Sequence, residues 1–224
     1  FWCSGTLQMT SYPMSEKTEL FPEYLYSREE SLRRQKEIED AEQEWLAAMP
    51  ENVSEYEKIK YLYEQIVWRT EYQEGGADDQ NIYSVLLNGQ SVCAGYARTM
   101  QYLAGKAGIF AAYVTGTATD PDTGEIQDHA WNLVKCDGKY SYVDTTWGDP
   151  VWTGEGARAG RIVYDYLCCP QEQLFLTHTP EEEIVFPVCD AYEQEYYRRN
   201  GRFYESYEEQ QICQVLREDI RSEE

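Results

Sequence analysis

The dipeptide Asp137-Gly138 constrains the fold of this chain more than any other short segment, because it separates two runs of strand-forming residues. Asp-Gly between such runs is the strongest short-range indication of a β-hairpin with a two-residue turn. We therefore predict that residues 129–136 and 139–144 form two antiparallel strands. The turn also fixes their register, because it pairs the residues on either side of it.

That register places three side chains on one face of the hairpin. Counting outward from the turn, Trp131 lies opposite Asp144, and residues two apart on a strand point to the same side. His129 therefore shares a face with Trp131 and is a diagonal neighbour of Asp144, with the two backbones about 7–8 Å apart. An imidazole and a carboxylate can close this gap with a hydrogen bond, so the spacing predicts a His129–Asp144 pair.

Helical patterns precede these strands. Apolar residues recur at helical spacing in four segments, which we expect to be helices: 27–49, 54–67, 82–87 and 93–105. The first two open with a serine followed by a glutamate three residues later, which is a capping box. The fourth begins with Cys93, which should therefore lie at or near a helix N-terminus.

The remaining elements complete an α+β order. A β-branched and aromatic run at 109–117 predicts a strand before the hairpin, and we expect another strand at 162–168. A short helical piece should follow Pro170, and a capping box at Ser206 should open a final helix. Helices followed by antiparallel strands predict the α+β class, with N-terminal helices packed on an antiparallel β-sheet.

The length of 224 residues suits a single domain, which we divide into three parts. We expect residues 1–53 to form an N-terminal helical extension and residues 54–150 to form the catalytic core. Residues 151–224 should complete the domain with a strand and helices. The chain starts with Phe1 rather than methionine, which we interpret as the start of a piece excised from a longer protein.

Composition excludes several classes of function. The net charge of −22 repels phosphate backbones, so we expect no nucleic-acid partner. No apolar run has the length of a bilayer span, so we expect no membrane insertion by this segment. The seven cysteines are odd in number and irregularly spaced, which disfavours a disulfide framework. The chain has two histidines, which disfavours a structural zinc site. We expect no metal and no cofactor.

The pattern around Cys93 indicates nucleophilic chemistry. A helix N-terminus and a nearby imidazolium both favour the thiolate, which is the form that attacks a carbonyl carbon. We therefore predict Cys93 as nucleophile, His129 as base and Asp144 as the residue that orients the base. The backbone N–H of Cys93 could also hold an oxyanion. On spacing alone, the alternative is that Cys93 and His129 are ordinary core residues.

Other residues are weaker candidates. Tyr83 and Gln90 precede the nucleophile and are possible oxyanion donors, with packing or loop roles as the alternative. Trp131 shares the hairpin face with the triad and Trp147 follows it, so either could wall a substrate cleft or pack in the core. His178 has no comparable hairpin partner, and we interpret it as a structural capping or packing residue.

Three segments, in this order, resemble the bacterial branch of the transglutaminase-like superfamily: Ser91-Val92-Cys93-Ala94-Gly95-Tyr96-Ala97, Asp128-His129-Ala130-Trp131-Asn132 and Val143-Asp144-Thr145-Thr146-Trp147. The resemblance extends over residues 55–150 and implies a papain-like cysteine-protease fold. It also implies the same roles for Cys93, His129 and Asp144 as the spacing argument. The flanking segments do not resemble the large animal crosslinking enzymes.

The resemblance implies acyl transfer on protein or peptide amides through a thioester, as in peptidases, amidases and transglutaminases. Hydrolysis and crosslinking use the same residues and differ in the acceptor, so both stay open. The alternative is a catalytically silent cell-surface interaction module of the same fold. The resemblance also suggests an extracytoplasmic bacterial protein, secreted or held at the cell surface, with a protein or peptide substrate.

Overall fold

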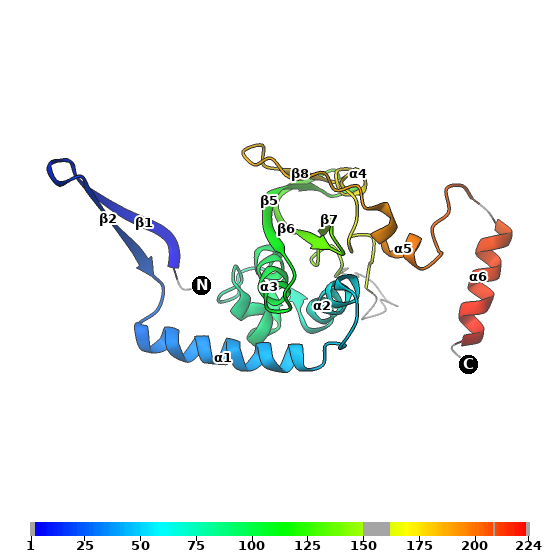
Figure 1. Cartoon of the computed structure of the whole chain (residues 1–224), viewed down its shortest axis with the longest axis horizontal. Helices are drawn as coiled ribbons and strands as arrows, with labels where there is room; N and C mark the ends of the chain where they lie inside the picture. Colours follow the sequence, from blue (N-terminus) through cyan, green and yellow to red (C-terminus); the bar gives the residue numbers. More distant parts are fainter. Residues whose placement is uncertain (1–2, 150–161, 208, 223–224) are drawn as a thin grey trace.

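The computed structural model describes residues 3–149, 162–207 and 209–222, which form helices and mainly antiparallel strands (Figure 1). Three long helices, α1 (Arg28–Ala47), α2 (Glu55–Arg69) and α3 (Cys93–Lys106), precede the main sheet along the chain. This order confirms the α+β class.

Two serine side chains begin the first helices as the capping boxes predict. Ser27 Oγ accepts a hydrogen bond from the backbone N–H of Glu30, and Ser54 Oγ accepts one from Glu57, each at 3.2 Å. Each bond satisfies an N–H that has no partner within its helix. The apolar run at 82–87 is helical too, as a π-helical turn at Ser84–Asn88.

The main sheet has four antiparallel strands in the order β7-β6-β5-β8. The strands are β5 (Ala111–Thr119), β6 (Ile126–Cys136), β7 (Lys139–Val143) and β8 (His178–Pro180). Cys136 pairs with Lys139, which confirms the register counted from the turn. Asp137 and Gly138 both have positive φ, at 48° and 87°, as a two-residue type I′ turn requires.

Helices α2 and α3 lie on one side of this sheet (Figure 1). Helix α3 packs against β5 and β6, and α2 packs against α3. The apolar face of α2 is fully buried in this core: Ile59, Leu62, Tyr63 and Ile66. A single buried amide ties helix and sheet together, since Asn132 Nδ2 on β6 donates to Ala97 O on α3 at 2.9 Å and to Ala112 O on β5 at 3.2 Å.

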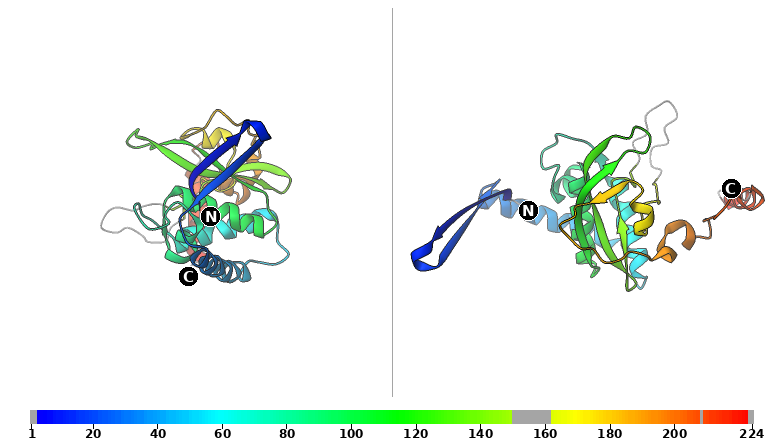
Figure 2. Two further views of the ribbon diagram at one scale, coloured as in Figure 1. Left: turned by 90° about the vertical axis from the view of Figure 1, so that its left-hand side faces the viewer. Right: turned by 90° about the horizontal axis from the view of Figure 1, so that it is seen from above.

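The prediction of a helical extension over residues 1–53 is wrong for its first half. Strands β1 (Cys3–Tyr12) and β2 (Lys17–Tyr24) form a separate antiparallel hairpin that extends away from the core (Figures 1 and 2). Leu7, Met9 and Leu20 lie on one face of this hairpin and are more than half exposed. The alternation that marks a strand is present, but the apolar face is not buried.

The strand predicted at 162–168 is also wrong. This segment is irregular, because the chain turns where the backbone N–H of Leu167 donates to Tyr164 O at 3.2 Å, and Cys168 then has a positive φ of 51°. It still lies along β7: Tyr142 and Cys169 exchange two backbone hydrogen bonds of 3.0 Å, and the backbone N–H of Asp144 donates to Tyr166 O at 3.0 Å.

The C-terminal part adds three helices: α4 (Gln171–Leu174), α5 (Tyr196–Arg199) and α6 (Glu209–Ser222). Helix α4 is the short piece predicted after Pro170, and α6 begins three residues after the predicted cap Ser206. Helix α6 lies apart from the core (Figure 2). In the part of the chain that the structure describes, no helix has the length and apolarity to cross a bilayer.

Candidate functional site

Cys93 is the first residue of α3, as predicted. The preceding residue, Val92, is extended and does not cap the helix with its side chain. Gly95 allows the first turn of α3 to press against the loop before it, because a Cβ at that position would lie 1.9 Å from Ser91 Oγ and 2.8 Å from Asp79 O. The thiol of Cys93 stays partly exposed. It therefore sits at a fixed helix N-terminus that solvent can reach.

The pair predicted from the hairpin register is present. His129 Nε2 lies 2.7 Å from Asp144 Oδ2, and both side chains are buried, with 8% and 1% of their surface exposed. The second carboxylate oxygen of Asp144 accepts the backbone N–H groups of Thr146 at 2.8 Å and Trp147 at 3.1 Å. These bonds hold the carboxylate in a single orientation toward β6.

The electrostatics of the pair favour a charged imidazole. Burial alone would lower the pKa of His129, but the negative charge and hydrogen bond of Asp144 outweigh it, and a hydrogen bond with the Cys93 thiol adds to them. Together they raise the pKa of His129 to about 10. Burial alone would raise the pKa of Asp144, but its contacts with His129 and His178 hold it well below the usual value. Cys93 and Asp144 thus both lie close enough to His129 to favour its charged form.

His178, which the sequence analysis treated as structural, lies in this site. Its Nε2 atom is 3.0 Å from Asp144 Oδ2, the same oxygen that binds His129. Its Nδ1 atom is 2.8 Å from the hydroxyl of Thr177, and the side chain is 1% exposed. No spacing in the sequence indicates this contact, because β8 reaches the sheet from 34 residues beyond Asp144. The scarcity of histidine was the available signal.

Gly116 explains how β8 comes so close. This residue pairs with His129 on one side and with Pro180 on the other. A Cβ on Gly116 would lie 2.1 Å from Thr179 O and 2.8 Å from Trp131 Cη2. The absence of a side chain therefore lets the β8 strand lie against β5 and carry His178 to Asp144.

These three residues also have the composition of a metal-binding group. One ligating atom each from His129, Asp144 and His178 lie within 4.8 Å of one another. However, both imidazoles already bind the same carboxylate oxygen, so an ion would have to replace two hydrogen bonds inside a buried site. We interpret the group as a hydrogen-bonded network rather than a metal centre.

The weaker candidates lie in different places. The Tyr83 hydroxyl donates to Glu37 on α1 at 2.7 Å, so this group joins α1 to the core and is not available as an oxyanion donor. Gln90 is exposed on the short strand β4 (Gln90–Ser91), which pairs with β3 (Glu71–Tyr72).

The two tryptophans differ. Trp131 is fully buried, its ring stacks on His129 at 6.0 Å, and its indole N–H has no partner. It packs against the buried side of the His129 imidazole and cannot line an open cleft. Trp147 is partly exposed, with its ring centre 6.0 Å from that of His129 and 4.7 Å from that of His178. Of the two, Trp147 alone can contact a substrate.

Two tyrosines that the sequence analysis did not single out lie near Cys93. Burial raises the pKa of Tyr72 to about 12, and the charge of Cys93 is the next contribution. Burial also raises the pKa of Tyr113, again with a contribution from Cys93. Arg98 of α3 lies over the Tyr113 ring at 5.0 Å. The surroundings of the thiol are thus aromatic with one nearby cation.

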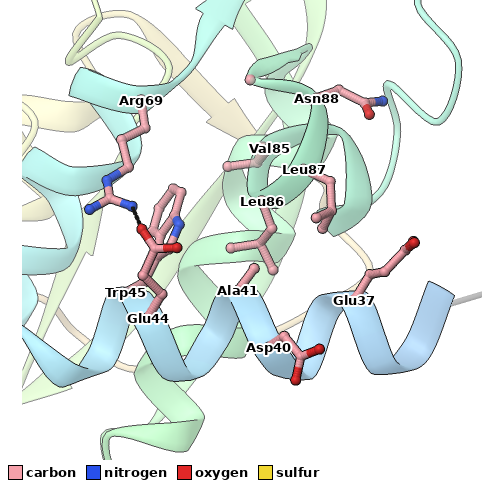
Figure 3. A pocket seen from close by; sticks show the side chains of 11 residues that line it. Glu37, Asp40, Ala41, Glu44, Trp45, Arg69, Val85, Leu86, Leu87 and Asn88 are labelled. Atoms are coloured by element: carbon pink, nitrogen blue, oxygen red, sulfur yellow. Dashed lines mark hydrogen bonds and ion pairs between the residues drawn. The ribbon is translucent and has the colours of Figure 1, made fainter. Parts of the chain in front are cut away.

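A surface cavity of about 500 Å³ lies elsewhere, between α1 and the segment 85–89 (Figure 3). Its floor is apolar, with Ala41 and Leu86, and its rim is acidic apart from Arg69, which binds Glu44 at 3.2 Å. None of the three predicted triad residues lines this cavity, so the cavity does not mark the proposed site.

Comparison with known proteins gives a family for the middle of the chain. Residues 46–145 match the model of the transglutaminase-like superfamily. No curated protein matches the chain.

Several solved structures resemble the fold. One is a TGase, with 17% sequence identity over 59% of this chain and a TM-score of 0.44. Another is a proposed cysteine protease from Cytophaga hutchinsonii, with 22% identity over 48% of this chain and a TM-score of 0.41. A third is menin, whose structure reveals the binding site for Mixed Lineage Leukemia protein. It has 19% identity over 56% of this chain and a TM-score of 0.32. The matches cover 37%, 37% and 28% of those chains, so this chain spans well under half of their length.

Proposed function

We propose that this protein catalyses acyl transfer on protein or peptide amides through a thioester on Cys93, because residues 46–145 match the model of the transglutaminase-like superfamily. In this proposal His129 is the base and Asp144 orients it. The observation that carries the proposal is the buried contact of 2.7 Å between His129 Nε2 and Asp144 Oδ2, beside a Cys93 that contributes to the raised pKa of His129.

The geometry determines which nitrogen of His129 exchanges protons with the thiol and the substrate. Asp144 engages Nε2 of His129, so Nδ1 is left for the thiol and the substrate. The carboxylate fixes this tautomer and stabilises the imidazolium that forms when the thiol gives up its proton. The raised pKa of His129 means that the imidazole holds this proton at neutral pH, which favours a thiolate–imidazolium pair.

The reaction would proceed in two halves. The sulfur of Cys93 forms a bond to the amide carbon, and the carbonyl electron pair moves to oxygen. When that oxyanion collapses, the C–N bond breaks and the leaving amine takes the proton of His129. Water or a second amine then gives a proton to His129 and attacks the thioester, and the C–S bond breaks to restore the thiolate.

The start of α3 would stabilise the oxyanion. The backbone N–H of Cys93 lies in the first turn of the helix, where N–H groups lack intrahelical partners. A donor in this position, with the positive end of the helix dipole, favours a negatively charged oxygen.

The chain offers an internal control for thiol reactivity. Among the described cysteines, Cys213 on α6 is partly exposed like Cys93 but lies on a separate helix. We expect iodoacetamide at pH 6 to alkylate Cys93 at least about tenfold faster than Cys213, as followed by mass spectrometry. His129→Ala should remove this advantage and leave Cys213 unchanged. Equal rates for both cysteines in the wild-type protein would contradict the proposal.

The acceptor can be identified separately. A glutamine-containing peptide offered with a labelled primary amine gives amine incorporation if the protein is a transglutaminase, and an acid or a cleaved backbone if it is a hydrolase. A Cys93→Ala variant is the control for each product. Absence of all three products with a broad peptide mixture would favour the second candidate function.

That second candidate is a catalytically silent interaction module. It is favoured by the β1–β2 hairpin, which exposes an apolar face away from the site, with Met9 at 69% and Leu20 at 56% exposure. The resemblance to a bacterial branch of the superfamily also supports an extracytoplasmic location, at the cell surface or secreted. Fractionation of cells that express the full-length protein tests this location directly.

A further inference from the structure

We infer that His178 is a positioning residue of the proposed triad, which holds the carboxylate of Asp144 in place and limits how strongly that carboxylate retains the proton of His129. The inference rests on the proposed function and extends it to a residue outside the three segments that resemble the family. It is carried by geometry, because two imidazoles bind one oxygen of a buried carboxylate.

Asp144 is fully occupied by hydrogen bonds. Its Oδ1 accepts two backbone N–H groups, and its Oδ2 accepts His129 at 2.7 Å and His178 at 3.0 Å. Both backbone donors come from the turn directly after Asp144. His178 is therefore the contact that ties this carboxylate to a distant part of the chain, and it lies on the oxygen that serves the base.

Thr177 determines which nitrogen of His178 carries a proton. In a neutral imidazole one nitrogen donates and the other accepts. An ionised carboxylate only accepts, so Nε2 of His178 must donate to Asp144. Nδ1 can then accept from the Thr177 hydroxyl at 2.8 Å, which is shorter than the alternative bond from that hydroxyl to Leu174 O at 3.4 Å. Thr177 thus holds His178 in the tautomer that supports Asp144.

Aromatic rings fix the position of the second imidazole. The ring centre of His178 lies 4.7 Å from Trp147, 5.0 Å from Trp131 and 5.8 Å from Tyr166. Its exposed fraction is 1%, so water does not compete for the bond to Asp144. This enclosure is typical of a side chain that sets the orientation of another group rather than one that contacts a substrate.

The titratable groups around Asp144 and His178 come from every element packed against them. They are His129 on β6, Cys93 on α3, Tyr63 on α2, Tyr72 on β3, and Asp165, Tyr166 and Cys169 on the segment beside β7. Burial first, and the charge of Asp144 second or later, raises the pKa of each of these tyrosines and of Cys169. These tyrosines and Cys169 have higher pKa values than His129, so they keep their protons over the pH range in which His129 titrates.

The expected effect has a definite sign. A donated hydrogen bond from His178 draws negative charge of Asp144 away from His129. Without it, the carboxylate attracts the His129 proton more strongly, and the imidazolium becomes a weaker acid. The leaving amine then receives its proton more slowly. We expect about a 3- to 10-fold loss of turnover, which corresponds to a change of half to one unit in the pKa of the acid.

The test uses the two histidines of the chain as reporters. Protein labelled with ¹⁵N-histidine gives two imidazole signals, assigned by comparison with His129→Gln. In His178→Phe, which removes the donor, we expect His129 to titrate about half to one pH unit higher than in the wild-type protein. His178→Gln, which restores an N–H donor, should bring the titration back toward the wild-type value. Thr179→Ala, an exposed neighbour on β8, is the matched control.

Two results would overturn the inference. One is a wild-type spectrum in which His178 carries its proton on Nδ1 alone. The other is a folded His178→Phe protein in which His129 titrates at the wild-type pH. Should His178→Phe fail to fold, Thr177→Val takes its place, and His129 is again expected to titrate at a higher pH than in the wild-type protein. The alkylation rate of Cys93 by iodoacetamide tests the proposed function separately from the role of His178. The proposed function is contradicted if Cys93 of the wild-type protein reacts no faster than Cys213, whatever the titration of His129 shows.

Discussion

Two β-hairpins of this chain have the same local architecture and different surroundings. The β6–β7 hairpin has both strands in a four-stranded sheet, and the side chains of β6 are buried almost continuously from His129 to Cys136. The β1–β2 hairpin stands alone, and every side chain described in its strands is at least partly exposed. Local pairing is therefore enough to form a hairpin, but not to build a site.

The difference lies in what burial does to polar groups. At the β6–β7 hairpin, His129 and Asp144 are withdrawn from water together with His178 of β8, so their mutual bonds persist and shift the pKa of His129 strongly. In the β1–β2 hairpin, the hydroxyls of Ser11 and Thr18 lie 3.4 Å apart across exposed strands, where water competes for the same bond. A buried network is specific because breaking it leaves unpaired groups.

The strongest test of this contrast is Asp144→Asn. We expect turnover to fall by about 10³- to 10⁴-fold, because the amide can favour the wrong imidazole tautomer and cannot stabilise the imidazolium. The fold should persist, since the hairpin register does not depend on the charge. Turnover with a peptide amide and circular dichroism check both parts. Wild-type rates in this variant would remove Asp144 from the mechanism.

Gly116→Ala tests whether β8 must lie against the sheet. The new Cβ would meet Thr179 O at 2.1 Å, which is backbone and cannot rotate away. We expect a loss of about 1–3 kcal/mol in the free energy of unfolding, measured by chemical denaturation. In the same variant, His129 should titrate at a higher pH than in the wild-type protein, as expected for His178→Phe. Gly105→Ala, where a Cβ meets no atom within 4 Å, is the matched control.

The pH dependence of stability should reflect the buried pair. The pKa of His129 is raised in the folded state, so its contribution is complete below about pH 6.5 and is lost as the pH rises toward about 10. The pKa of Asp144 is lowered, so its contribution is present above about pH 4 and is lost as the pH falls. Denaturation of the wild-type protein and of His129→Gln at several pH values measures the difference. A difference that stays constant between pH 6.5 and 10 would contradict the raised pKa.

Removal of residues 1–24 should have the smallest effect. The described side chains of the β1–β2 hairpin are at least partly exposed, so we expect the free energy of unfolding to change by less than about 0.5 kcal/mol. The alkylation rate of Cys93 should stay the same. A slower Cys93 in the shortened protein would show that this hairpin contributes to the site, and the contrast between the two hairpins would no longer hold.

Much of the local structure follows from short-range chemistry. The caps at Ser27 and Ser54 and the turn at Asp137-Gly138 were predictable because each depends on contacts within about four residues. The segment at 162–168 was not, because its apolar residues follow β7 through isolated bonds rather than a ladder. The β1–β2 hairpin was missed because few apolar side chains alternate along β1 and because β2 contains Pro22.

The sequence by itself determined the register of the β6–β7 hairpin, and with it the meeting of His129 and Asp144, because a two-residue turn leaves a single pairing. It also placed Cys93 at a helix start. Only the tertiary structure decided that His178 completes the carboxylate's bonds, since a bare Gly116 lets a distant strand approach. Contacts between segments far apart in the chain depend on packing, and no local spacing encodes them.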